Sequence, residues 1–171
     1  MSIAASSNQR RAELLTLGLT ALLVLVADQL TKAAVVSGLA LGERAQVLGD
    51  LVVIWHVQNS GSAFSLFQFE GSLILFYVVH LVALGMVAYF HRTFHGRGLW
   101  LQLILGIVLG GSIGNLADRL RQGYVTDFIS VGFGDVRFPT WNIADAGITV
   151  GITLLVAYLV LLEPRRAETG A

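Results

Sequence analysis

Apolar residues gather into four long runs along the chain, separated by more polar segments. The runs cover residues 14–36, 73–90, 99–118 and 141–162. An α-helix needs about 20 apolar residues to cross the hydrocarbon core of a bilayer. The pattern therefore predicts an α-helical integral membrane protein with four transmembrane helices. We expect residues 1–171 to form a single membrane-embedded domain and the tail at 163–171 to be disordered.

The segment at 37–71 follows the first run and is too apolar for a freely solvated loop. Residues 47–57 are rich in Val, Ile and Trp, and Asn59, Ser60 and Gly61 come next. Strand-forming residues that end in a turn signal indicate a short strand or hairpin. We expect this segment to rest on the membrane surface or against the helices.

The composition is typical of a membrane protein and excludes several types of functional site. The chain is 55% hydrophobic and only 13% charged, whereas soluble domains are about 25% charged. It has no cysteine, which excludes disulfide frameworks and Cys-based metal sites or nucleophiles. Its formal net charge of zero gives no reason to expect a nucleic-acid partner.

The positions of the basic residues predict the orientation in the membrane. The short connection at 91–98 carries Arg92 and Arg97 without an acid, and both terminal segments also carry an arginine pair. This side has six basic and three acidic residues, against five and eight on the other side. Basic residues mark the cytoplasmic side, so we expect both termini in the cytoplasm and residues 37–71 and 120–140 outside.

Polar residues capable of chemistry gather at the predicted outer ends of the runs and in the outer segments. They are Asp28, Asn59, Asn115, Asp118, Arg119, Asp127, Asn142 and Asp145. Ionisable groups at membrane depth are costly and usually face a cavity or a partner. Their gathering at one face indicates a site there, because an ion pathway would scatter them through the bilayer.

Asp127 and Asp145 are the strongest candidates for catalysis. Asp127 lies in the apolar stretch YVTDFISVGF, where a solvated aspartate would not be expected. Asn142 and Asp145 share a face at the start of the fourth run, after the helix-start residues Pro139 and Thr140. The helix dipole there favours an ionised Asp145.

Two carboxylates in a site of low dielectric constant tend to share one proton. The ionised member can activate a water, and the protonated member can polarise a carbonyl and donate to the leaving amine. This chemistry requires no metal or cofactor, and we expect none. Histidines at metal-ligand spacing near the acids are missing from the sequence. His56 is the one histidine on the predicted outer side, and its sequence position does not assign it a catalytic or a structural role.

Two pairs of charged residues near the site can be interpreted as structural rather than catalytic. For Asp118 and Arg119, an ion pair that stabilises the helix end and the following loop is the favoured interpretation. Asp28 and Lys32 are four residues apart with the acid first, which suits a helical ion pair. An anchoring role and a catalytic role both remain open for Asp28 and Lys32.

Five segments together resemble signal peptidase II, the prolipoprotein signal peptidase family. They are VADQLTK, QNSGSAFS, GGSIGNLADR, VTDFI and WNIADAGI, which appear in this order over about residues 22–160. The resemblance implies a bacterial inner-membrane aspartic endopeptidase that is blocked by globomycin. Such an enzyme removes the signal peptide from diacylglyceryl-modified prolipoproteins by cutting before the lipidated cysteine.

The resemblance also implies roles for individual residues. Asp127 and Asp145 correspond to the catalytic pair, and Asp118 does not. Five further residues line or support the site: Asp28, Asn59, Asn115, Arg119 and Asn142. Residues 37–71 would form a small extracytoplasmic β-cradle, and we expect a monomer surrounded by membrane lipid.

Two alternative functions belong to other classes. A small proton-coupled membrane carrier would use Asp127 and Asp145 as proton-binding sites, and its polar residues would continue to the cytoplasmic side. A non-catalytic membrane scaffold would depend on glycine faces such as Gly106, Gly110 and Gly114, which let helices approach closely in lipid.

Overall fold

The computed structural model describes residues 7–60 and 72–161. Within them the chain forms the helices α1 (Ser7–Gly38), α2 (Ser72–Thr93), α3 (Leu99–Gln122) and α4 (Ile143–Leu161). It also forms the strands β1 (Arg44–Leu48), β2 (Val52–Asn59), β3 (Val125–Phe133) and β4 (Val136–Arg137). The tail at 163–171, predicted to be disordered, lies outside the described residues.

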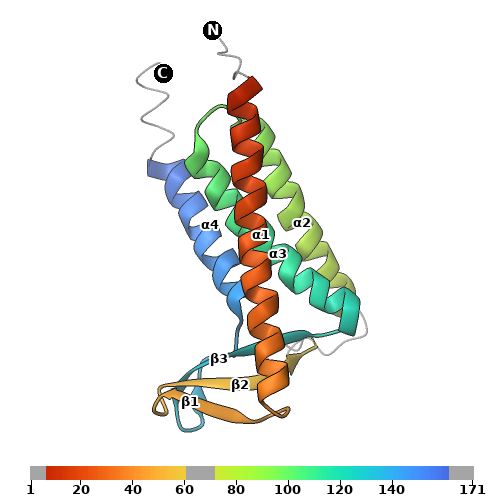
Figure 1. The fold of residues 1–171 in the computed structure, drawn as a ribbon, viewed down its shortest axis with the longest axis vertical. Helices are drawn as coiled ribbons and strands as arrows, with labels where there is room; N and C mark the ends of the chain where they lie inside the picture. Colours follow the sequence, from red (N-terminus) through yellow and green to blue (C-terminus); the bar gives the residue numbers. More distant parts are fainter. Residues whose placement is uncertain (1–6, 61–71, 162–171) are drawn as a thin grey trace.

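Helix α3 is the central element of the bundle. It packs against α1, α2 and α4, and the sheet lies at one end of the helices (Figure 1). The start of α1, the α2–α3 connection and the end of α4 lie at the opposite end. Each predicted apolar run corresponds to one helix, although α1 begins seven residues before its run and α2 and α3 end three and four residues after theirs.

Most large apolar side chains of the helices face outward. Leu23, Leu30, Leu81 and Val160 are each more than 60% exposed, while the buried core is a small cluster around Leu101 and Leu105. Within the described residues, α1, α3 and α4 are long and apolar enough to cross a bilayer. Outward apolar faces on such helices are suited to contact with lipid.

Small residues bring α3 close to its neighbours. A Cβ at Gly110 would lie against the carbonyl oxygen of Ala21 and 2.8 Å from Cβ of Val24. A Cβ at Gly114 would lie 2.7 Å from a carboxylate oxygen of Asp28. The glycines therefore set the distance between α1 and α3, and with it the position of the polar groups at their ends.

Gly110→Ala should lower the thermal unfolding midpoint in detergent, because overpacking of a close interface costs roughly 1–3 kcal/mol. Gly85→Ala on α2 is the matched control, since a Cβ there meets no atom within 4 Å. Circular dichroism melting of both variants beside the parent protein tests this expectation. Equal midpoints for the two variants would show that the α1–α3 distance tolerates a methyl group.

The four strands form one antiparallel sheet in the order β1-β2-β3-β4. The predicted hairpin within 37–71 is present as β1 and β2, and residues 61–71 of that segment lie outside the described residues. No strand was predicted for residues 120–140, yet β3 is the strand that places Asp127. Local pattern did not reveal β3, because Asp127 interrupts its apolar alternation and its pairing partner β2 lies far away in sequence.

A bulge between Ile54 and Val57 sets the register of β2 and β3. Beyond it, Val57 pairs with Asp127 and Asn59 pairs with Val125. Directly paired residues share a sheet face, and diagonal neighbours are close enough for contact between long side chains. The register therefore brings Asn59 next to Asp127.

The chain between β4 and α4 is tied to β3. The backbone N–H of Ile129 donates to the carbonyl of Trp141 at 2.7 Å, and the N–H of Trp141 donates to the carbonyl of Ile129 at 3.1 Å. Because Trp141 is held in an extended bridge, α4 begins at Ile143, two residues later than the predicted run. Pro139 and Thr140 thus precede the helix start by several residues.

The end of the bundle far from the sheet contains buried polar groups that the sequence analysis did not single out. The Glu13 carboxylate accepts the backbone N–H of Gly96 at 2.9 and 3.0 Å. Gln102 and His91 are joined at 2.8 Å. The first contact fastens the α2–α3 connection to α1, and the second joins the end of α2 to the start of α3.

Candidate active site

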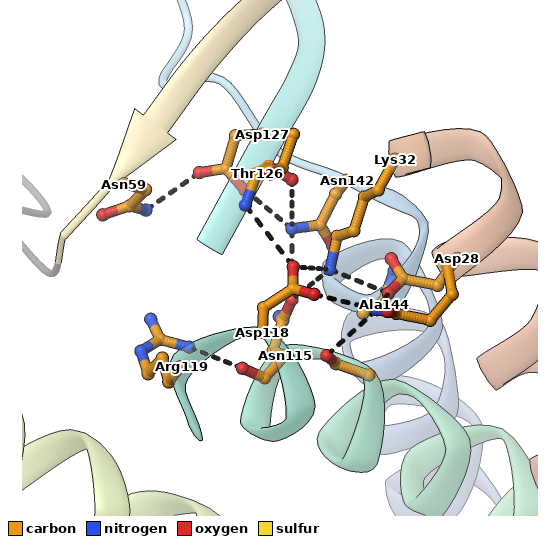
Figure 2. A network of polar contacts seen from close by, with 12 residues as sticks. Asp28, Lys32, Asn59, Asn115, Asp118, Arg119, Thr126, Asp127, Asn142 and Ala144 are labelled. Atoms are coloured by element: carbon orange, nitrogen blue, oxygen red, sulfur yellow. Dashed lines mark hydrogen bonds and ion pairs between the residues drawn. The ribbon is translucent and has the colours of Figure 1, made fainter. Parts of the chain in front are cut away.

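Asp127 lies near the start of β3, at the junction of the sheet and the helices. Its side chain is 2% exposed. One carboxylate oxygen accepts from Nδ2 of Asn59 at 2.8 Å, and the other accepts from Nδ2 of Asn142 at 2.6 Å. Two side-chain amides from different elements therefore fix the orientation of Asp127 (Figure 2).

Asn142 joins Asp127 to Asp145. Its Oδ1 accepts the backbone N–H of Asp145 at 2.9 Å, and its own backbone N–H donates to the Asp145 carboxylate at 3.3 Å. This reciprocal arrangement caps the N-terminus of α4. The same amide that caps the helix thus holds Asp127, so the two aspartates sit on either side of Asn142.

The two aspartates influence each other electrostatically. Burial, and secondarily the nearby charge of Asp145, raise the pKa of Asp127 to about 7. The hydrogen bonds from Asn59 and Asn142 act in the opposite direction. A carboxyl group with this pKa carries a proton through the acidic range and can act as an acid near neutral pH.

A second buried group of charges lies next to the aspartates and is connected to them through Asn115. Lys32 is 2.7 Å from Asp28 and 2.9 Å from Asp118, and all three side chains are at most 3% exposed. The helical pair Asp28–Lys32 is thus confirmed. The predicted partner of Asp118 is wrong: Asp118 pairs with Lys32 from α1 and with Arg121 at 3.4 Å, because close packing of α1 on α3 brings Lys32 nearer.

Asn115 connects this buried charge cluster to Asp145. Its Oδ1 accepts from Lys32 at 2.9 Å, and its Nδ2 donates to the Asp145 carboxylate at 2.7 Å. Six of the seven predicted site residues therefore lie in one continuous network: Asp28, Asn59, Asn115, Asp127, Asn142 and Asp145. Lys32 belongs to the same network, although it is not among the seven predicted site residues.

Arg119 is the seventh predicted site residue and lies at the edge of this network. Its guanidinium group is 3.5 Å from the carbonyl oxygen of Asn115 and lies over the Phe76 ring at 4.5 Å. In the described structure it bonds neither aspartate of the pair. The guanidinium group therefore lies beside the network without bonding to either aspartate.

His56 has a position that favours a structural role. Its Nδ1 is 3.0 Å from the carbonyl oxygen of Leu39, and its backbone carbonyl accepts the N–H of Gly42. These contacts hold the turn between α1 and β1 against β2. Among the described contacts of His56, none reaches Asp127 or Asp145.

An apolar cavity of about 520 Å³ opens beside Asp145. Its walls come from the segment before α4, including Phe138 and Trp141, and from the outward face of α4, including Thr149 and Val150. A carboxylate at the wall of an apolar cavity is a typical arrangement for a binding site. The cavity can therefore hold an apolar part of a ligand within reach of Asp145.

The chemistry available here is that of carboxylates and amides. Among residues 7–60 and 72–161, no group of three His, Cys, Asp or Glu side chains is placed to hold a metal ion. Asp127 and Asp145 are positioned by amide donors, and burial raises the pKa of Asp127. This arrangement can supply one acid and one base to a reaction.

The chain is similar to known proteins over most of its length. The family model described as signal peptidase (SPase) II matches residues 20–161. The lipoprotein signal peptidase of Shouchella clausii is 38% identical, with 84% of this chain and 91% of that protein covered. The enzyme of the same name from Bacillus velezensis is 37% identical, with 88% and 97% covered.

Solved structures show the same fold. A bacterial membrane enzyme determined at 1.9 Å resolution has a TM-score of 0.76 and 26% identity, with 95% of this chain and 99% of that chain covered. A second, at 2.3 Å resolution, has a TM-score of 0.73 and 28% identity, with 83% and 85% covered. With most of its length matched by the family model and by these relatives, the chain belongs to the signal peptidase II family.

Proposed function

We propose that the protein removes signal peptides from diacylglyceryl-modified prolipoproteins by an aspartic mechanism, cutting before the lipidated cysteine. Family membership supports the prolipoprotein substrate. The observation that carries the mechanism is the amide-bridged pair of carboxylates, Asp127 and Asp145, joined through Asn142. The cavity beside Asp145 fits a substrate with a large apolar part.

In the proposed reaction the two aspartates share one proton. Asp145 is the ionised member and removes a proton from the attacking water. Asp127 is the protonated member, in keeping with its raised pKa, and it polarises the scissile carbonyl. After attack, a carboxyl proton passes to the leaving amine and the peptide bond breaks. Asn115 and Asn142 hold the two carboxylates apart and in orientation.

We also propose that α2 is a fourth span and that the sheet is an outer cradle for the substrate. Helix α2 starts at the sheet end and finishes at the far end (Figure 1), and its 22 residues are about 33 Å long at 1.5 Å per residue. With basic residues at the far end, both termini lie in the cytoplasm and the active site faces outward. The protein acts as a monomer in the bacterial inner membrane.

Cleavage of a lipidated prolipoprotein by the purified protein in detergent or nanodiscs tests the proposal. We expect release of the signal peptide, inhibition by globomycin, and no release from the same precursor without its diacylglyceryl group. Mass spectrometry of the products identifies the bond that is cut. Cleavage of both precursors at equal rates would contradict the proposed requirement for lipid.

The rate should depend on pH through the shared proton. Because burial and Asp145 raise the pKa of Asp127 to about 7, Asp127 keeps its proton below that pH and loses it above. The rate should therefore fall on the alkaline side with a midpoint near 7, and on the acidic side where the pair takes up a second proton. A pH–rate profile that is flat between about pH 4 and 9 would contradict this.

A further inference from the structure

Lys32 occupies an unusual position for a cation in this chain. It is the only lysine, beside ten arginines, and its side chain is 3% exposed. Its ammonium group has three acceptors: Asp28 at 2.7 Å, Asp118 at 2.9 Å and Oδ1 of Asn115 at 2.9 Å. An ammonium group has three N–H donors and no acceptor, so these contacts account for all of its donors.

Each carboxylate bound to Lys32 also holds the backbone next to one catalytic aspartate. Asp28 accepts the backbone N–H of Ala144 at 2.9 Å, and Ala144 directly precedes Asp145. Asp118 accepts the backbone N–H of Thr126 at 3.4 Å, and Thr126 directly precedes Asp127. The charge cluster therefore holds the backbone of Ala144 in α4 and of Thr126 in β3, the residues that directly precede the two aspartates (Figure 2).

The contact of Lys32 with Asn115 fixes the orientation of the Asn115 side-chain amide. Because the ammonium group can only donate, Asn115 must turn its Oδ1 toward Lys32 and its Nδ2 away. That Nδ2 donates to Asp145 at 2.7 Å. Asn142 donates to the same Asn115 oxygen at 3.2 Å and to Asp127 at 2.6 Å. Lys32 thereby determines that the pair faces amide donors rather than amide oxygens.

We propose that Lys32 is a positioning residue for the catalytic pair, acting through Asp28, Asp118 and Asn115. This inference rests on the proposed function, which assigns catalysis to Asp127 and Asp145. Lys32 touches neither the substrate nor the pair. It controls where the two aspartates lie and which way the adjacent amide of Asn115 points.

The geometry explains why lysine stands here in a chain that otherwise uses arginine. The three acceptors come from two helices and converge on one nitrogen atom. A compact ammonium group suits such a point, whereas the planar guanidinium fork spreads its donors and requires more room. A positive charge at position 32 is therefore not sufficient to bind all three acceptors, and the compact shape of the ammonium group is also required.

Lys32→Arg and Lys32→Met separate geometry from charge. Both should lower kcat on the order of 10²-fold with little change in KM, because misplacement of reacting groups by about 1 Å costs that much. Arg92→Met is the matched control. It removes an exposed cation in the last turn of α2, at the end of the bundle far from the charge cluster, so kcat should stay within about twofold of the parent value.

The pH–rate profile distinguishes positioning from simple loss of stability. Lys32 contacts Asp28 on α1 and Asp118 on α3. Arg119 and Arg121, also on α3, interact with Asp118, and Asp127 on β3 and Asp145 on α4 interact electrostatically with Lys32. Lys32 favours the ionised form of Asp127. Its removal in Lys32→Met should shift the alkaline limb to higher pH, whereas Lys32→Arg should leave the limb in place.

A measurement on the unsubstituted protein avoids dependence on folding of the variants. Labelling with [15N]lysine gives a single side-chain amine signal, because the chain has one lysine. Its NMR shift should follow pH with the midpoint of the pH–rate profile, and Asp127→Asn should abolish this dependence. A signal that does not move over that range, or full kcat in Lys32→Arg, would overturn the positioning role.

The catalytic role of Asp127 and Asp145 and the positioning role of Lys32 can be refuted separately. If Asp127→Asn retains normal turnover, the catalytic pair itself is wrong and the inference on Lys32 falls with it. If Asp127→Asn is inactive while Lys32→Met keeps the parent kcat and pH–rate profile, the pair stands and only the role of Lys32 is refuted.

Discussion

Asp127→Asn and Asp145→Asn should each reduce kcat for prolipoprotein cleavage by at least about 10³-fold, because each removes the acid or the base of the proposed proton transfer. An amide has nearly the shape of a carboxylate but cannot exchange the shared proton. Binding of the substrate should change little, since the cavity beside Asp145 keeps its walls. Initial rates with purified variants in nanodiscs measure the effect.

Asp135→Asn is the matched control for these substitutions. Asp135 lies exposed in the turn between β3 and β4, so the same chemical change there should leave kcat within about twofold of the parent value. Thermal melting should show that all three variants are folded. Near-normal turnover by either Asp127→Asn or Asp145→Asn would refute the aspartic mechanism.

Substitutions of Asn142 should have the second-largest effect on activity. Its side chain caps α4 through Asp145 and donates to Asp127 at 2.6 Å. Asn142→Ser keeps a hydroxyl oxygen for the helix cap but is too short to reach Asp127. Asn142→Ala removes both functions. We expect both variants to lose about 10²-fold in kcat, the cost expected for a displaced reacting group.

The two Asn142 variants should differ in stability. Loss of an N-cap costs about 1 kcal/mol, and serine is among the favoured capping residues. Asn142→Ala should therefore melt at a lower temperature than Asn142→Ser. If Asn142→Ser instead kept the parent kcat, the hydrogen bond to Asp127 would have no catalytic importance and Asn142 would serve only as a helix cap.

Several features of the site could be predicted from local sequence. Asp28 and Lys32 meet because four residues make slightly more than one helical turn, and Asn142 meets Asp145 for a related reason. The burial of Asp127 could be predicted from its apolar neighbours, Val125 and Phe128, which are buried with it. Short-range geometry and hydrophobicity are encoded directly in residue order.

Contacts between distant segments could not be predicted in the same way. The strand β3 is recognisable only beside β2, and the bulge in β2 decides that Asn59 rather than a neighbour meets Asp127. Asp118 has Arg119 next to it in sequence, yet it pairs with Lys32 from another helix. Such contacts depend on register and on helix spacing, which residue order near each site does not reveal.

The sequence by itself determined a membrane protein with four apolar runs, polar groups at one end and an acid in an unexpectedly apolar stretch. Hydrophobicity is additive along a run, so these features do not depend on the rest of the chain. Only the tertiary structure decided that Lys32 lies at the centre of the polar network. The close approach of α1 to α3 at Gly110 and Gly114 places the ammonium group among acceptors more than 80 residues away, because packing sets distances that local sequence cannot.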